Sequence, residues 1–141
     1  MNIWVNGCFD ILHVGHLNLL RNAKYYTDPR FNKKGEKNIL YIGIDSDRRI
    51  KEMKGNSRPI NNQKDRKRML ESLRFVDKVF IYDTDEDLSF CIEHYNIDLM
   101  IIGEDYKDKK VIGSEKSKYG VVFYPKDEHS TTNIINKIKD L

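Results

Sequence analysis

The sequence predicts an α/β fold in which one open, mostly parallel sheet of five strands carries helices on both faces. Five short apolar runs recur along the chain without polar alternation, as expected of strands that are covered on both sides. Segments with helical spacing of apolar residues lie between these runs, and such alternation favours parallel pairing through right-handed crossovers. A length of 141 residues suits one ordinary domain, so we expect residues 1–141 to form a single domain.

The strands and helices can be assigned in chain order. The expected strands are residues 3–5, 39–42, 79–82, 99–102 and 121–124. Helical spacing joins Leu17, Leu20 and Ala23, then Met69, Leu70 and Leu73, then Leu88, Ile92 and Tyr95. A last helix is expected from Ile134, Ile135, Ile138 and Leu141, which follow N-cap hydroxyls at residues 130–132. The resulting arrangement is Rossmann-like.

Two polar segments interrupt this pattern. Residues 27–38 predict a long surface loop between the first helix and the second strand. Residues 54–63 include Gly55, Arg58 and Pro59, and they are expected to form a flap on the substrate side. Neither segment has the composition of a domain linker.

Composition and charge exclude several classes of protein. Apolar residues make up 39% and charged residues 33% of the chain, which is typical of a soluble globular domain. No apolar run approaches the roughly 20 residues that span a bilayer, so we expect a cytoplasmic protein without a membrane partner. A net charge of +3 is too small to indicate nucleic-acid binding, and aromatic residues do not interleave with the basic clusters. Cys8 and Cys91 are expected to stay reduced.

The most informative segment is Asn6-Gly7-Cys8-Phe9-Asp10-Ile11-Leu12-His13-Val14-Gly15-His16, where the first strand ends and the first helix begins. In an open α/β sheet, ligands bind at the carboxyl ends of strands, and a glycine there lets phosphate approach the backbone. His13 and His16 are three residues apart, so both imidazoles can face one ligand. Gly15 leaves room for that approach. The structural alternative is a pair of histidines that only cap or pack at a helix start.

This segment fits the HxGH signature and resembles the cytidylyltransferase-like nucleotidyltransferases. Further blocks resemble the adenylyltransferase domain of bacterial heptose 1-phosphate enzymes in order and spacing. They are residues 54–60 with Arg66, residues 103–107, residues 112–115 and residues 130–135. Glycerol 3-phosphate cytidylyltransferases are the next most similar group. The related heptose enzymes are often fused to a kinase domain, whereas this sequence resembles the transferase part alone. A partner kinase is therefore expected to be a separate protein.

The resemblance implies an in-line attack by a substrate phosphate oxygen on the α-phosphorus of a nucleoside triphosphate, with release of pyrophosphate. Catalysis of this kind depends on positioning and on stabilisation of developing charge. By resemblance, His13 and His16 donate hydrogen bonds to phosphate oxygens and neither acts as a nucleophile. Arg66 completes the expected catalytic set, because a guanidinium can fork onto phosphate oxygens.

The resemblance also implies a set of residues around the nucleotide and its phosphates: Gly7, Cys8, Phe9, Asp10, Gly15, Gly103, Asp105, Ser130, Thr131 and Thr132. Lys54 and Arg58 are expected on the substrate side, with a solvated loop as their alternative. The hydroxyls at 130–132 can cap the last helix as well as bind phosphate. Asp10 can alternatively hold the Gly7 turn through an Asx hydrogen bond. Cys8 is expected to pack near the nucleotide without reacting.

Three functional hypotheses follow from the resemblance. The leading one is transfer of AMP from ATP to heptose 1-phosphate, giving ADP-heptose, because Lys107, Gly113-Ser114 and residues 132–135 follow that subgroup. The second is a CTP-dependent enzyme acting on glycerol 3-phosphate or a related polyol phosphate. The third, from another class, is a nucleotide-binding regulatory module that has lost catalysis. A homodimer is expected, as is Mg²⁺ held mainly by nucleotide phosphates, since the sequence shows no dedicated carboxylate cage.

Overall fold

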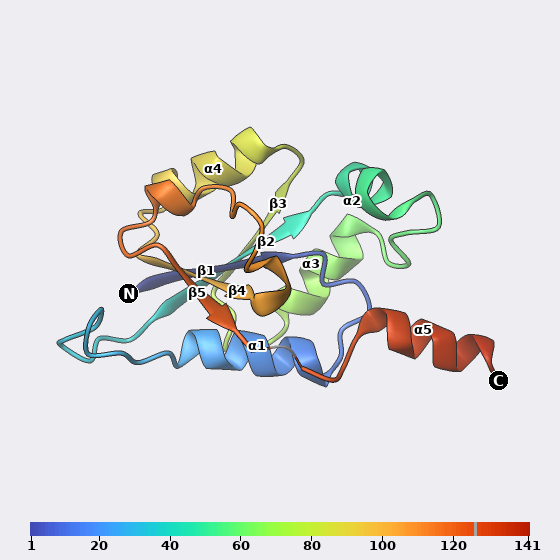
Figure 1. Ribbon diagram of the computed structural model, residues 1–141, viewed down its shortest axis with the longest axis horizontal. Coiled ribbons are helices and arrows are strands. Elements are labelled where there is room, and N and C mark those ends of the chain that lie inside the picture. The colour runs from blue at the N-terminus through green and yellow to red at the C-terminus, as the bar shows by residue number, and fades with distance from the viewer. Residues whose placement is uncertain (126) are drawn as a thin grey trace.

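The computed structural model describes residues 1–125 and 127–141 and contains a five-stranded sheet with helices on both faces (Figure 1). The strands are β1 (Asn2–Gly7), β2 (Ile39–Asp45), β3 (Lys78–Tyr82), β4 (Leu99–Gly103) and β5 (Val121–Tyr124). Their order is β3-β2-β1-β4-β5, and every neighbouring pair is parallel. The predicted open α/β sheet is therefore confirmed, and each strand lies where the sequence placed it.

In the part of the chain that the structure describes, five α-helices and two short 3₁₀ helices accompany the sheet. The α-helices are α1 (Val14–Lys24), α2 (Asp47–Lys54), α3 (Gln63–Glu71), α4 (Asp85–His94) and α5 (Thr131–Lys139). The 3₁₀ helices are η1 (Glu104–Tyr106) and η2 (Ser114–Lys116). Side-chain oxygens of Ser46, Asn62, Thr84 and Ser130 cap α2, α3, α4 and α5 by accepting a backbone N–H of the first turn. These caps fix where each helix begins.

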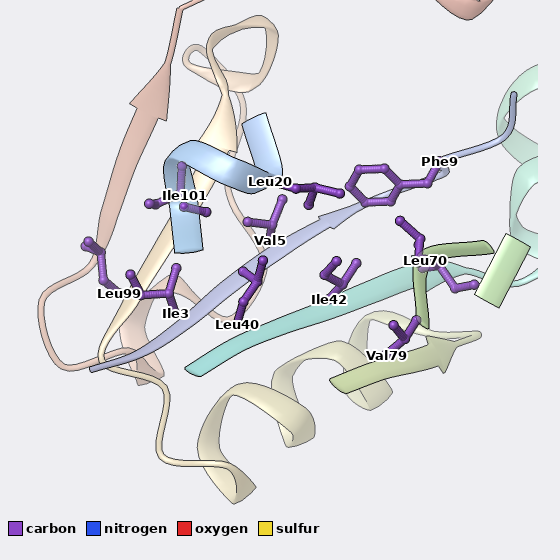
Figure 2. Packing of buried hydrophobic residues seen from close by; sticks show 12 residues of the cluster. Ile3, Val5, Phe9, Leu20, Leu40, Ile42, Leu70, Val79, Leu99 and Ile101 are labelled. Atoms are coloured by element: carbon purple, nitrogen blue, oxygen red, sulfur yellow. The ribbon is translucent and has the colours of Figure 1, made fainter. Parts of the chain in front are cut away.

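Each face of the sheet has its own apolar core. Successive side chains of a strand point to opposite faces, so Ile3 and Val5 join one core while Trp4 joins the other. Figure 2 shows the first core, in which Leu20 of α1 and Leu70 of α3 pack with the strands. The second core contains apolar side chains of α4. Coverage on both faces is why the strands read as continuous apolar runs.

The strand order creates a switch point beside β1. From β1 the chain proceeds to β2 and β3 on one side, and then crosses to β4 and β5 on the other side. The connections that leave the carboxyl ends of β1 and β4 therefore diverge. In open α/β sheets, such a divergence opens a crevice in which ligands bind.

The polar loop of residues 27–38 lies at the opposite end of the strands. Asn38 is buried, and its side-chain amide donates to the carbonyl oxygens of Lys24 and Tyr26 at 3.1 and 2.7 Å. The Phe31 ring lies 5.1 Å from the ring of Tyr119, just before β5. The loop thus folds onto the amino-terminal edge of the sheet, away from the switch point.

Helix α5 projects beyond the sheet at the carboxyl end of the chain (Figure 1). None of its residues is buried, although Ile134 and Ile135 are half-buried. Across residues 1–125 and 127–141, no helix has the length and apolar character needed to cross a membrane. The amino end of α5 is the part that returns to the body of the protein.

Candidate active site

A cleft of about 330 Å³ lies at the switch point. It is lined by the β1–α1 connection, the start of α1, the segment from 54 to 58, the end of β4 with η1, and the residues before and at the start of α5. The lining includes these residues singled out from the sequence: Gly7, Cys8, Phe9, Asp10, His13, Gly15, His16, Lys54, Arg58, Gly103, Asp105, Ser130, Thr131 and Thr132. Four blocks that are far apart in the chain therefore meet in one place.

His13 and His16 form a stacked pair at the start of α1. Their ring centroids are 3.8 Å apart with an interplanar angle of 22°. The backbone N–H of His13 donates to Nδ1 of His16 at 3.3 Å, so Nδ1 is the acceptor and the ring proton of neutral His16 is on Nε2. Nε2 of His16 is thus a hydrogen-bond donor without a positive charge.

Burial keeps both imidazoles neutral in the free protein. Desolvation is the main cause that lowers the pKa of His16 to about 4, and the neighbouring His13 and Lys54 lower it further. Desolvation also lowers the pKa of His13, followed by repulsion from His129. Two neutral donors beside developing negative charge are suited to phosphate oxygens.

Gly15 is required by the close approach of two histidines. A Cβ atom at this position would lie 2.9 Å from Cε1 of His13 and 3.1 Å from Cβ of His129. Cβ atoms in proteins rarely come so close to non-bonded heavy atoms, so a side chain at position 15 would displace the His13 ring. This is a steric reason for glycine at the third position of the His13–His16 segment.

The residues between β1 and α1 combine strain with burial. Phe9 has φ 48°, a left-handed conformation that is uncommon for a bulky residue, and its ring is buried 5.3 Å from the His16 ring. The Cys8 thiol donates to Oδ2 of Asp45 at 3.4 Å. Desolvation and Asp45 raise the pKa of Cys8 to about 11, so the thiol stays protonated and is a poor nucleophile.

Asp10 ties the flap segment to the β1–α1 connection. Its two carboxylate oxygens accept the backbone N–H groups of Ile60 and Asn61 at 2.7 and 2.9 Å. The alternative Asx hydrogen bond at the Gly7 turn does not describe this geometry. Lys54 and Arg58, which precede residues 60 and 61 in the chain, line the side of the cleft.

Arg66 occupies a different place from the one expected. Its side chain is buried, with 1% of the residue exposed, and it does not line the cleft. Nη1 donates to the carbonyl oxygens of Cys8 and Asp45, both at 2.8 Å. Nε donates to the carbonyl of Asn61 at 3.0 Å, and Nη2 pairs with Oδ1 of Asp47 at 2.9 Å. The expected fork onto phosphate oxygens is therefore replaced by contacts that hold together the segments around the cleft.

The amino end of α5 closes the far side of the cleft. Ser130 caps the helix by accepting the backbone N–H of Asn133 at 3.0 Å. Thr131 donates its hydroxyl to the carbonyl of Ile11 at 3.3 Å, which joins α5 to the β1–α1 connection. Thr132 is exposed and lines the cleft. Backbone N–H groups and the dipole at a helix start favour a phosphate there.

The cleft also contains residues to which the sequence analysis gave no individual role. They are Asn6, Leu19, Glu104, Tyr106, Tyr124, Pro125, Asp127 and His129. His129 has a recognisable signal, because it directly precedes the Ser-Thr-Thr segment. Asp127 pairs with Nδ1 of His129.

The donor set of the cleft suits phosphate groups better than a bare metal ion. Among residues 1–125 and 127–141, no three His, Cys, Asp or Glu side chains gather as metal ligands. Neutral imidazoles, hydroxyl groups, Lys54 and Arg58 are all potential partners of phosphate oxygens. Mg²⁺ is still expected to bind together with the nucleotide, held mainly by the phosphate oxygens.

Comparison with known proteins identifies the family. The sequence profile described as "Cytidylyltransferase-like" matches residues 4–137, which is nearly the whole chain. The chain belongs to the cytidylyltransferase-like family. Membership makes it a nucleotidyltransferase, in agreement with the resemblance drawn from residues 6–16 and the later blocks.

The chain is similar to one part of larger proteins. It is 45% identical over 137 residues to the "Bifunctional protein HldE" of Campylobacter fetus subsp. fetus, covering 97% of this chain and 28% of that protein. The same-named protein of Helicobacter pylori is 40% identical over 137 residues, covering 97% of this chain and 27% of the relative. The chain therefore spans little more than a quarter of the length of these relatives.

A solved structure confirms the fold. It is described as a lipopolysaccharide core biosynthesis protein from Thermoplasma volcanium GSS1, with a TM-score of 0.65 at 20% identity. The match covers 92% of this chain and 98% of that one. At this identity the likeness shows a shared Rossmann-like architecture only.

Proposed function

We propose that the chain transfers AMP from ATP to a heptose 1-phosphate, forming ADP-heptose and releasing pyrophosphate. The observation that carries the proposal is that one cleft brings together neutral His13 and His16, the start of α5, and the two basic side chains of Lys54 and Arg58. Identity of 40–45% to HldE proteins supports the heptose branch of the family. The blocks at 103–107 and 130–135 support it as well, since they resemble heptose 1-phosphate adenylyltransferases.

The reaction is a substitution at the α-phosphorus. A phosphate oxygen of the sugar phosphate forms the new bond to this phosphorus, while the bond to the oxygen bridging the α- and β-phosphates breaks and pyrophosphate leaves with that oxygen. No covalent enzyme intermediate is involved, which agrees with a protonated Cys8 thiol. Mg²⁺, when bound with the triphosphate, neutralises part of its charge.

The side chains of the cleft position the phosphates and stabilise charge. His16 donates from Nε2 to an oxygen that gains charge in the transition state, and His13 lies beside it in the same stack. The N–H groups and Thr132 hydroxyl at the start of α5 bind the polyphosphate. Lys54 and Arg58 attract the phosphate of the acceptor.

A pyrophosphate-release assay tests the proposal. Each ribonucleoside triphosphate is combined with heptose 1-phosphate, glycerol 3-phosphate and other sugar or polyol phosphates, and His16→Ala serves as the control for background hydrolysis. We expect release to require ATP and heptose 1-phosphate together. Preference for CTP with glycerol 3-phosphate would replace the proposal by the second hypothesis. Nucleotide binding without release in every combination would favour a regulatory module.

We also infer a homodimer in which α1 and its neighbouring loops pack across a two-fold axis near the active sites, as the resemblance implies. Val14, the first residue of α1, is 53% exposed and is available for such packing. Light scattering at micromolar concentration should give twice the mass of one chain. A fully active monomer would contradict the inference.

A further inference from the structure

A third histidine extends the stack formed by His13 and His16. The His129 ring lies 6.3 Å from the ring of His13, with an interplanar angle of 24°. At the other end of the stack, the Phe9 ring packs against the His16 ring. The order of rings is therefore Phe9, His16, His13 and His129 along one side of the cleft.

His129 is held by a carboxylate that is itself anchored to α1. Asp127 accepts the backbone N–H of His129 at 3.0 Å and pairs with Nδ1 of its ring. The side-chain amide of Asn18, on α1, donates to the other Asp127 oxygen at 3.0 Å. The backbone N–H of His129, the Asn18 amide and the His129 ring hold the pKa of the Asp127 carboxyl well below its usual range. The carboxylate thus stays charged and keeps the His129 ring in one orientation.

This arrangement leaves one ring nitrogen of His129 for a ligand. Nδ1 is committed to Asp127, so Nε2 is the remaining nitrogen on a ring that lines the cleft and is 42% exposed at its side chain. In a neutral ring with its proton on Nδ1, Nε2 carries a lone pair and repels an anion. Only the imidazolium form donates a hydrogen bond from both nitrogens.

We propose that His129 is a third histidine for the phosphate chain of the nucleotide, donating from Nε2 to a phosphate oxygen as an imidazolium, with Asp127 as its positioning residue. The proposal rests on the proposed function, because it takes a nucleoside triphosphate as the ligand of this cleft. The role differs from that of His13 and His16, which are neutral donors. The positive charge at His129 is balanced by the Asp127 carboxylate and by the bound phosphate.

Charged and titratable groups surround the His129 ring. His13 and Asp127 face the ring directly, and Glu128, Lys137 and Asp140 line the adjoining hollow on the side of α5. Loss of the Asp127 charge removes support for the imidazolium, so Asp127→Asn should weaken nucleotide binding.

Calorimetric titration with ATP and with CTP tests the proposal, because it needs no turnover. We expect His129→Ala to weaken binding about tenfold or more, because it removes a hydrogen bond between two charged groups. Binding should weaken in Asp127→Asn as well, because the variant loses the carboxylate that orients the ring. His129→Lys should restore much of the affinity, which a purely packing role would not allow.

The matched control is His94→Ala, which removes an exposed histidine on α4 that does not line the cleft. Melting temperatures of all variants show that they are folded. Unchanged affinity in His129→Ala, relative to His94→Ala, would overturn the role of His129 while wild-type nucleotide binding and transfer stand. A wild-type protein that neither binds a nucleotide nor releases pyrophosphate would overturn the proposed function and this inference together.

Discussion

Replacing Arg66 with alanine separates a structural role from a phosphate-binding role. The guanidinium connects the end of β1, the end of β2, the start of α2 and the segment before α3. Its side chain is fully shielded from solvent, whereas that of Asp47 is 31% exposed. The substitution would leave three backbone carbonyl oxygens without this donor.

The contacts set the expected size of the effect. An acceptor left unsatisfied in a buried place costs about 1–3 kcal/mol, and breaking a buried ion pair typically costs about 3–5 kcal/mol in total. Asp47 can regain water, so we expect the free energy of unfolding to fall by about 3–5 kcal/mol. That is a large part of the roughly 5–15 kcal/mol that stabilises an ordinary domain.

Urea denaturation followed by circular dichroism measures this loss. Arg68→Ala is the matched control, because Arg68 is an exposed arginine of the same helix, and its change should stay within about 0.5 kcal/mol. A loss below about 1 kcal/mol for Arg66→Ala, together with much weaker nucleotide binding, would refute the structural role. It would restore the direct phosphate contact that the sequence predicted.

Three further predictions follow from the cleft. Thr132→Ala should raise KM for the nucleotide or lower kcat about tenfold. The stability of the variant should change by no more than about 0.5 kcal/mol, because Ser130 and not Thr132 caps α5. Unchanged kinetics would contradict phosphate binding by Thr132. Gly15→Ala should lower kcat by about 10²-fold, since its Cβ would lie 2.9 Å from His13. Steady-state kinetics of Gly15→Ala equal to those of the wild type would contradict this steric role of Gly15. His16 has a pKa near 4 in the folded protein and near 6.5 unfolded, so the unfolded chain binds more protons between these values. Stability should therefore fall as the pH is lowered through this window, and less so in His16→Ala, as urea midpoints would show.

The fold was largely predictable because its signals are local. Five apolar runs and the helical spacing in α1, α3 and α4 follow from burial against a two-sided sheet. The strand order β3-β2-β1-β4-β5 was not predictable, since nothing in a short apolar run such as residues 121–124 says which neighbour it pairs with. Helix α5 was predicted from its apolar spacing, yet its residues remain unburied, because periodicity indicates an apolar face and not the surface that covers it.

The site was predictable where a motif carries it and less so where tertiary contacts decide. His13, Gly15 and His16 lie together as their spacing indicated. Arg66 sits among Lys64, Lys67 and Arg68 and reads as part of a solvated basic face. Arg66 precedes Leu70 by four residues and Leu73 by seven, which places all three on one face of a helix. This spacing was the signal that the Arg66 side chain points toward the core. The contact between Asn18 and Asp127, which anchors the His129–Asp127 pair to α1, joins residues 109 positions apart, and no local pattern reveals it.

The central claim is that this cleft performs nucleotidyl transfer through donors aimed at developing charge. Comparison of turnover and nucleotide affinity in His16→Ala tests it most directly, because Nε2 of His16 is the neutral donor fixed by the His13 backbone. We predict that kcat falls by about 10²–10³ while the Kd for the nucleotide changes far less. Equal losses in both quantities, or unchanged turnover, would contradict the account.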